Sequence, residues 1–261
     1  MSEKQKFRTA IILCGGKGTR LGALSKKIPK TLIKIHNERI LWFIIKILKK
    51  NKFSHFILPV GYKGKQIKKF IKRTFNNENI EIFNTGSNTS ISSRIHKVKK
   101  YIKSDDFLLL NGDAIFNFNL DKIYKNHVKN KTKMTFISFG FMAIFGTVGV
   151  RKGKVLDFRR NFTFDFVKSK DKKSLKAYVY SGMSIMNKIT FSKNFKNYDN
   201  FEKKLYPWII ENFKCNVETP SGFFHAIDNM KDVSVANSPY SEDSKYLQIK
   251  RLKKLINSTK N

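Results

Sequence analysis

Acidic residues are scarce in this chain. Its 261 residues include 19 Asp and Glu against 53 Lys and Arg, which gives a formal net charge of +34 at pH 7. Such an excess suits nucleic acid, because clustered cations condense onto phosphate backbones. However, the lysines are spread along the whole chain and form no long basic block. Lys, Asn, Ile and Phe are over-represented together, as A/T-rich codons would produce, so we expect no specific nucleic-acid partner.

Cysteines and long apolar runs are also scarce. Cys14 and Cys215 are the only two cysteines, and neither belongs to a C-x-x-C pair, so reduced thiols are expected. No run of 18 apolar residues occurs, which predicts that nothing spans a membrane. The first apolar stretch is too short for a signal peptide and leads directly into a glycine-rich loop. These absences predict a cytoplasmic protein with no membrane partner.

The most informative segment follows the apolar run at residues 10–13, which predicts a short buried strand. Residues 14–20 then read CGGKGTR. Glycine N–H groups can approach an anion closely, and Arg20 and Lys30 add positive charge, so this pattern predicts a triphosphate site. The Walker A spacing is not met, and Leu21 stands where the last glycine of G-x-G-x-x-G would be. A glycine-rich turn without a ligand is the alternative.

Strand-like and helix-like segments alternate through the first half of the chain. This order predicts an α/β fold with a mainly parallel sheet and helices on both faces. The second half is richer in strands. We predict one domain over residues 1–240, with a small β-rich subregion at about 141–190. A helical tail is expected over 241–261, with five apolar residues partly on one face: Leu247, Ile249, Leu252, Leu255 and Ile256.

Two aspartates each follow an apolar segment. Asp113 comes directly after a predicted buried strand, and ligands of open α/β sheets bind where such strands end. Helix capping is the alternative, but the next predicted helix begins too far downstream. Asp228 ends an aromatic segment, and capping of a helix over 229–235 is a stronger alternative there. Mg²⁺ needs only one or two carboxylates, so two aspartates 115 residues apart suffice if the fold brings them together. His225 has no second His or Cys at zinc spacing and is interpreted as structural.

The loop motif resembles the signature of the sugar-1-phosphate nucleotidyltransferases. It reads G-x-G-T-R-L, and Pro29 and Lys30 follow nine and ten residues after Arg20. Other segments resemble the glucose-1-phosphate cytidylyltransferase branch of that family. They are residues 40–42, 61–64, 84–89 with Arg94, 112–113 and 222–228, so the similarity extends from about residue 8 to about residue 235.

The resemblance implies a Rossmann-like nucleotidyltransferase fold with a mixed sheet, and often a homo-oligomer. It implies transfer of a cytidylyl group from CTP (or another NTP) to a sugar 1-phosphate or related phosphorylated acceptor, with release of pyrophosphate. Arg20 would grip the β- and γ-phosphates, and Lys30 would lie between the reacting phosphates. Asp113 and Asp228 would hold Mg²⁺. The nucleotide would be bound by eight residues: Leu13, Gly15, Gly16, Gly18, Thr19, Thr89, Arg94 and Gly112.

The departures from the family fall on the acceptor side. Ser92 and Ser93 replace paired glycines, and Arg160 stands where V-x-x-F-x-E-K-P has its glutamate. A cation in place of a carboxylate favours an extra anionic group on the acceptor. We predict that Arg160, Ser181 and Gly182 bind the acceptor. A nucleotidyltransferase that uses GTP, dTTP or UTP and a non-catalytic nucleotide-binding paralogue remain alternatives.

Overall fold

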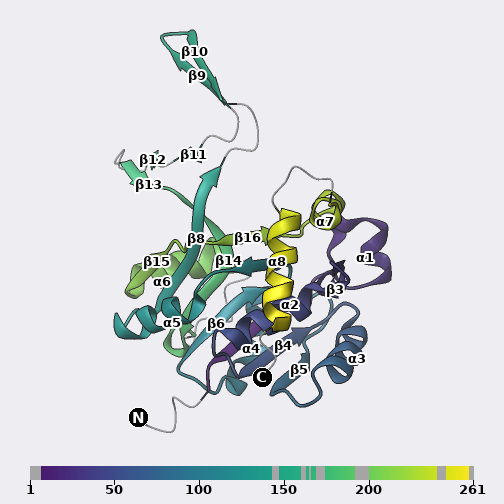
Figure 1. Cartoon of the computed structure of the whole chain (residues 1–261). Coiled ribbons are helices and arrows are strands. Elements are labelled where there is room, and N and C mark those ends of the chain that lie inside the picture. Colours follow the sequence, from purple (N-terminus) through teal and green to yellow (C-terminus); the bar gives the residue numbers. More distant parts are fainter. Residues whose placement is uncertain are drawn as a thin grey trace.

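The fold is built on one twisted sheet of eight strands (Figure 1). The computed structural model describes residues 7–142, 147–159, 163–164, 166–168, 174–191, 200–239 and 245–258. The strand order is β11-β8-β14-β6-β1-β4-β5, and β15 also pairs with β8. The strands are β1 Thr9–Leu13, β4 His55–Val60, β5 Ile80–Asn84, β6 Asp106–Asn111, β8 Met134–Met142, β11 Thr163–Phe164, β14 Tyr178–Asn187 and β15 Cys215–Glu218.

The parallel part of the sheet lies at its centre. β6, β1, β4 and β5 run in the same direction, whereas β14 is antiparallel to both β6 and β8. Strands covered on both faces need apolar residues at every position, which explains why β1, β4 and β6 are continuous apolar runs rather than alternating ones. The predicted α/β class and the mainly parallel mixed sheet are confirmed.

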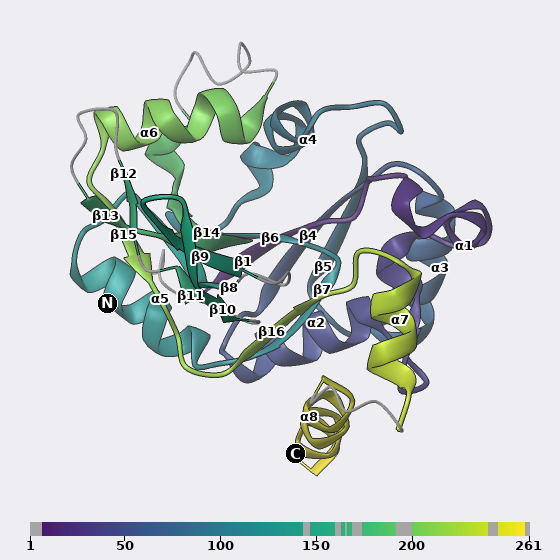
Figure 2. The same ribbon diagram turned by 90° about the horizontal axis from the view of Figure 1, so that it is seen from above.

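Helices cover both faces of the sheet (Figure 2). One face carries α2 Ile40–Lys50, α3 Gly64–Thr74 and α5 Leu120–Lys129. The other carries α4 Ile91–Val98 and α6 Tyr206–Asn212. In α2, eight of the eleven residues are buried, which is why the sequence shows a nearly unbroken apolar run there. The short elements are α1 Ala23–Lys27, β2 Lys34–Ile35, β3 Glu38–Arg39, and the 3₁₀ turns η2 Thr19–Leu21, η3 Lys30–Leu32, η4 Lys99–Tyr101 and η5 Lys188–Thr190.

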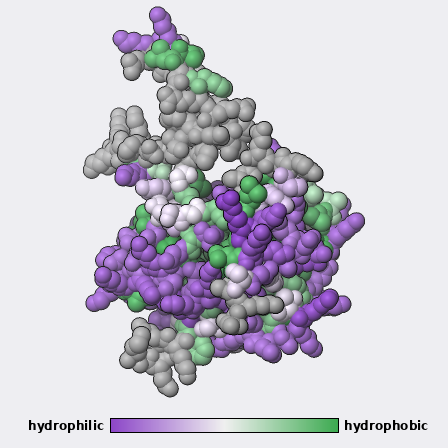
Figure 3. Space-filling model, viewed as in Figure 1, coloured by the Kyte–Doolittle hydropathy of each residue, from purple (hydrophilic) through white to green (hydrophobic). Residues whose placement is uncertain are grey.

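The strand-rich subregion contains small separate sheets. β9 Thr147–Arg151 pairs with β10 Lys154–Arg159, and this hairpin projects away from the main sheet (Figure 1). β12 Phe166–Lys168 pairs with β13 Ser174–Lys176. Figure 3 shows a largely hydrophilic surface over the body of the protein, with hydrophobic side chains on the hairpin; Val155, Leu156 and Phe158 are each more than 60 % exposed (65, 62 and 64 %). Arg160 lies outside the described residues.

The C-terminal helix packs onto the same core. α7 Met230–Asn237 precedes α8 Lys245–Ser258, and Ile249 and Leu252 of α8 join the cluster under α2, with Ile256 against it. These three positions lie on one helical stripe. Leu247 and Leu255 lie off that stripe and are 52 % and 43 % exposed, so only part of the predicted set shares one face. The domain boundary at residue 240 stays a prediction. In the described part of the chain, no helix is both long enough and apolar enough to cross a bilayer.

Asp121 in the first turn of α5 provides a test of what stabilises the fold. Its carboxylate accepts from Arg8 at 2.5 Å and from Lys125 at 2.9 Å. Burial alone would raise the pKa of Asp121, but these cations outweigh it and lower the pKa to about 2. Because the folded pKa lies below the unfolded value of about 3.9, the contribution to stability is complete above that value and disappears as the pH falls toward 2.

We therefore expect Asp121→Asn to lower the free energy of unfolding by about 1 kcal/mol at pH 7, since the pair is mostly, but not fully, shielded. The difference from the wild type should shrink as the pH falls from roughly 5 toward 2. Urea unfolding across this range measures it. A difference that is independent of pH would show that Asp121 does not act through its charge.

Candidate active site

A pocket of about 720 Å³ opens where β1 and β6 end. Leu13 and Asn111 are partners across these parallel strands, and the Gly112 N–H donates to the Leu13 carbonyl at 3.2 Å. The glycine-rich loop and the turn before Asp113 therefore leave the sheet side by side, at the strand ends where α/β proteins bind ligands. The pocket is lined by residues 13–18, Arg20, Lys30, Thr31, residues 87–91, Arg94 and residues 111–113.

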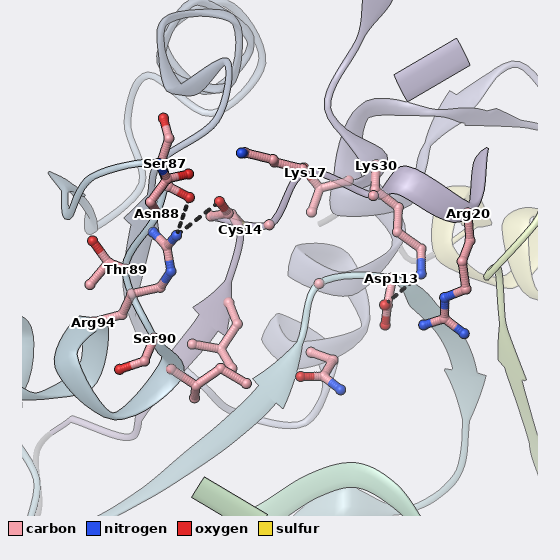
Figure 4. Close-up of a pocket in the computed structure, with 18 residues that line it drawn as sticks. Cys14, Lys17, Arg20, Lys30, Ser87, Asn88, Thr89, Ser90, Arg94 and Asp113 are labelled. Atoms are coloured by element: carbon pink, nitrogen blue, oxygen red, sulfur yellow. Dashed lines mark hydrogen bonds and ion pairs between the residues drawn. The ribbon is translucent and has the colours of Figure 1, made fainter. Parts of the chain in front are cut away.

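Arg94 connects the glycine-rich loop to residues 85–87 on one side of this pocket (Figure 4). Its side chain is buried, and its guanidinium donates to Thr85 Oγ1 at 2.7 Å, to the Gly15 carbonyl at 3.1 Å and to the Ser87 carbonyl at 3.2 Å. A Cβ atom on Gly15 would lie 2.1 Å from Arg94 Nη1, so the loop needs glycine at this position. Arg94 thus lines the predicted nucleotide pocket and holds the loops around it.

Lys30 lies at the centre of the opposite side of the pocket. Its ammonium donates to Asp113 Oδ2 at 2.8 Å and to Asp228 Oδ1 at 2.6 Å. Arg20 Nη2 lies 3.2 Å from the same oxygen of Asp228, on a side chain that is 73 % exposed. The four residues predicted to be catalytic or metal-binding therefore meet in one cluster. Two of them, Asp113 and Asp228, share a single cation.

A pair of short strands brings the two aspartates together. β7 Ala114–Asn117 is antiparallel to β16 Phe223–Ala226, with Ala114 opposite Ala226. At its end the Ile227 N–H donates to the Asp113 carbonyl at 2.9 Å. This pairing was not predicted from the sequence, because a four-residue strand next to a turn carries too little periodicity to be recognised.

The structure excludes helix capping for both aspartates. After Asp113 the chain continues into β7, not into a helix. Asn229 caps α7, because its side chain accepts from the Asp232 N–H at 3.0 Å and the Asp232 carboxylate accepts from the Asn229 N–H at 3.1 Å. Asp228 precedes this cap, so its carboxylate remains available to Lys30 and Arg20. The capping box thus orients the segment that carries Asp228.

The two carboxylates fit a magnesium ion that is bound together with substrate. Lys30 Nζ contacts both carboxylates, so the two face the same position. Within the described residues, no cluster of three or more His, Cys, Asp and Glu side chains could hold a metal. Two carboxylates with substrate phosphates are a common Mg²⁺ environment, whereas two alone make a weak site. His225 contacts Gln248 of α8 at 2.7 Å and stacks on Phe223, as expected for a structural residue.

Other predicted site residues differ in how they face the pocket. Leu13, Gly16, Gly18, Thr89 and Gly112 line it, whereas Thr19 begins η2 and does not. The Ser181 hydroxyl is buried and donates to the Ile137 carbonyl at 2.6 Å, so only its backbone is left for an acceptor.

Several pocket residues were not predicted from the sequence. Lys17 reaches across the pocket in Figure 4, and it could have been found from its place inside the glycine-rich loop. Ser87, Asn88, Ser90 and Asn111 also line the pocket. Their side chains are common in turns, so their type alone gave no signal of a ligand. The role of each site residue stays a prediction.

Comparison with known proteins decides the family. The family model described as "Nucleotidyl transferase" matches residues 9–146, more than half of the chain and the part that carries the glycine-rich loop and Asp113. The chain belongs to this family. It is a nucleotidyltransferase, and the predicted resemblance to the sugar-1-phosphate nucleotidyltransferases is confirmed.

Relatives of this nucleotidyltransferase differ in the nucleotide that they are named for. It is 28 % identical over 255 residues to a probable glucose-1-phosphate cytidylyltransferase of Bacillus subtilis, which covers 89 % of this chain and 96 % of the relative. It is 27 % identical over 230 residues to the D-glycero-alpha-D-manno-heptose 1-phosphate guanylyltransferase of Campylobacter jejuni, covering 84 % and 99 %. The crystal structure of HddC from Yersinia pseudotuberculosis, complexed with GMP-PN, has the same fold, with a TM-score of 0.65 at 19 % identity, covering 88 % of this chain and 98 % of that one.

Proposed function

We propose that this nucleotidyltransferase transfers a cytidylyl group from CTP to a sugar 1-phosphate or related phosphorylated acceptor, with Mg²⁺, in the cytoplasm. The product would serve nucleotide-sugar and surface-glycan biosynthesis. The observation that carries the proposal is the cluster of Arg20, Lys30, Asp113 and Asp228 beside the glycine-rich loop. The resemblance of residues 40–42, 61–64 and 222–228 to cytidylyltransferases supports CTP, as does the Bacillus subtilis relative.

GTP is the second candidate for the donor. The Campylobacter jejuni relative is named a guanylyltransferase, and the Yersinia pseudotuberculosis structure is a complex with GMP-PN. Ser87, Asn88 and Ser90 form the polar wall of the pocket on the α4 side, away from Lys30 and Arg20. If the phosphates lie at the cations, the base lies at this wall. The choice of base therefore rests on residues 87–90 and on the backbone around them.

The chemistry follows from bringing two polyanions together. An acceptor phosphate oxygen attacks the α-phosphorus of the NTP in line, and pyrophosphate leaves. Lys30 offsets negative charge where the two phosphates meet, and Arg20 stabilises the leaving pyrophosphate. Mg²⁺ held by Asp113 and Asp228 would neutralise charge on the α-phosphate and the acceptor phosphate. No covalent nucleophile is needed, and burial raises the pKa of the Cys14 thiol, which keeps this pocket residue protonated.

Pyrophosphate release across substrates tests the proposal. The four NTPs are each combined with α-D-glucose 1-phosphate, α-D-mannose 1-phosphate, a heptose 1-phosphate, glycerol 3-phosphate and phosphocholine. We expect release with CTP and at least one sugar 1-phosphate. Release with GTP alone would replace the donor. Nucleotide binding without release from any pair would favour the non-catalytic paralogue.

Two substitutions test the assigned roles. Arg20→Ala and Asp113→Asn should each lower turnover by about 10²–10³-fold, the usual cost of removing one group that stabilises charge in the transition state. Arg73→Ala on the exposed side of α3 and Asp105→Asn, which is also exposed, are matched controls and should leave turnover unchanged. Near wild-type turnover in either active-site variant would remove its residue from the mechanism.

A further inference from the structure

A narrow second pocket adjoins the nucleotide pocket on the side of β14. It shares Leu13, Ile91 and Asn111 with the first pocket, so the two are adjacent. Its other lining residues are Leu109, Tyr180, Gly182, Phe201, Glu202 and Tyr206. The positive charges of the first pocket, Lys17, Arg20, Lys30 and Arg94, are absent from this lining, which includes one carboxylate. If the phosphate of a ligand lies at the cations of the first pocket, the part of the ligand that reaches the second pocket meets polar groups and no positive charge.

Glu202 is that carboxylate, and no cation among the described residues forms an ion pair with it. It lies on η7 Phe201–Leu205, a π-helical turn that leads into α6. Such turns are rare and often mark functional positions. In the described part of the chain, Asp113 and Asp228 are paired with Lys30, whereas Glu202 makes no ion pair or hydrogen bond. Burial, with a smaller contribution from the nearby negative charge of Glu202, raises the pKa of Tyr180 to about 12.

Asn111 provides a neutral polar group between the two pockets. Gly182 lies in a bulge of β14 with φ +75°, and a Cβ atom on it would lie 2.4 Å from Asn111 Nδ2. Glycine at this position therefore makes room for the Asn111 amide. Asn111 is two residues from Asp113, so a ligand group bound to its amide lies next to the reacting phosphates. An amide and a carboxylate can together donate to and accept from hydroxyl groups.

We propose that Glu202 and Asn111 bind ring hydroxyls of the acceptor sugar. This inference rests on the proposed function and names the part of the molecule that selects the acceptor. Glu202 supplies the carboxylate of the second pocket from η7. The second pocket is too narrow for a whole sugar ring, so it receives the hydroxyl edge of a ring whose phosphate lies at Lys30.

The test compares Glu202→Gln with Glu211→Gln, a matched change on the exposed surface of α6. The probes are α-D-glucose 1-phosphate, α-D-mannose 1-phosphate and their deoxy analogues, with phosphocholine as an acceptor that has no hydroxyl. For the sugar phosphate that is turned over, Glu202→Gln should raise KM by about tenfold, the typical effect of losing a hydrogen bond to a charged group. The KM for the NTP should stay within about twofold, because only acceptor binding is lost. A deoxy analogue that lacks the contacted hydroxyl should show no difference between the wild type and the variant.

Several results would overturn the proposal. They are an unchanged acceptor KM in Glu202→Gln, an equal loss in Glu211→Gln, an equal loss with phosphocholine, or a raised KM for the NTP alone. Isothermal titration of α-D-glucose 1-phosphate and α-D-mannose 1-phosphate, with Mg²⁺ and a non-hydrolysable CTP analogue, separates the two proposals. Binding that depends on Glu202 without turnover by the wild type would contradict the proposed function and support this site. Binding that is equal in both proteins, or absent from both, would contradict the site.

Discussion

Lys30→Met is expected to lower turnover by at least about 10³-fold, because the ammonium is the cation nearest the reacting phosphates. The same variant should bind Mn²⁺ more tightly than the wild type does when no nucleotide is present. The substitution should therefore weaken catalysis and strengthen metal binding. A simple loss of folding would weaken both.

The reason for the second effect lies in the contacts of Lys30. Its Nζ lies 2.8 Å from Asp113 and 2.6 Å from Asp228, so it neutralises the two oxygens that would bind a metal. Any divalent ion must displace this ammonium before it can reach both carboxylates. With methionine at position 30, the two carboxylates lose the cation that they share, and only the exposed Arg20 remains beside Asp228. That arrangement favours a divalent ion, since an opposite charge at close range relieves their repulsion.

Mn²⁺ binding to the nucleotide-free protein, measured by electron paramagnetic resonance, tests this directly. We expect the dissociation constant to fall by about tenfold, which corresponds to the loss of one competing charge. Lys34→Met on β2 is the control, because Lys34 is exposed and lies outside the pocket. Adding Asp113→Asn to Lys30→Met should abolish the gain. Unchanged Mn²⁺ affinity in Lys30→Met would show that the ammonium does not compete with the metal.

Gly15→Ala is expected to cost about 3 kcal/mol or more of folding free energy, a large effect for a single methyl group. The new Cβ would lie 2.1 Å from Arg94 Nη1 and 2.3 Å from its Cζ, so the guanidinium must move. Moving it into the pocket that Arg94 lines breaks its bonds to Thr85, Gly15 and Ser87. Hydrogen bonds from a charged donor are worth about 1.5–3 kcal/mol each, so losing this set is costly even if water replaces part of it.

The neighbouring glycine is the matched control for this prediction. A Cβ on Gly16 meets nothing within 4 Å, and Gly16 has no positive φ, so Gly16→Ala should change stability by less than about 0.5 kcal/mol. Urea unfolding followed by circular dichroism measures both variants. Equal stability of Gly15→Ala and Gly16→Ala would show that the loop moves freely around Arg94. Nucleotide binding by Gly15→Ala should also be lost, because the displaced guanidinium no longer holds residues 85–87.

Elements with a strong local signal could be predicted from the sequence. β1 and β6 were recognised as buried strands because each is an apolar run that ends at a loop with polar site residues. Glycines, cations or aspartates that directly follow an apolar strand are uncommon in this chain. This pattern pointed to the glycine-rich loop with Arg20 and Lys30, and to the two aspartates. Contacts that depend on distant segments could not be predicted. Lys30 contacts two carboxylates that are far apart in the sequence, and Arg94 fills the space beside Gly15. Local residue spacing indicates neither contact.

Glu202 illustrates this limit on the acceptor side. It lies in a lysine-rich segment that predicts only an exposed helix, and its position depends on a π-helical turn that no periodicity reveals. Arg160, which the sequence analysis places with the acceptor, lies outside the described residues. The sequence therefore predicted more of the residues that line the first pocket than of those that line the second.

The β7–β16 pair also determines when activity can appear during synthesis. Asp113 belongs to the first half of the chain, but its partner is delivered by main-chain pairing with residues 223–226. A ribosome-bound chain that has exposed β1, β4, β5 and β6 already has its glycine-rich loop, yet only one of the two carboxylates. Domains generally fold as units, and this one is not complete until its last strands have emerged. A nascent chain that ends before residue 223 therefore lacks the segment that brings Asp228 beside Asp113.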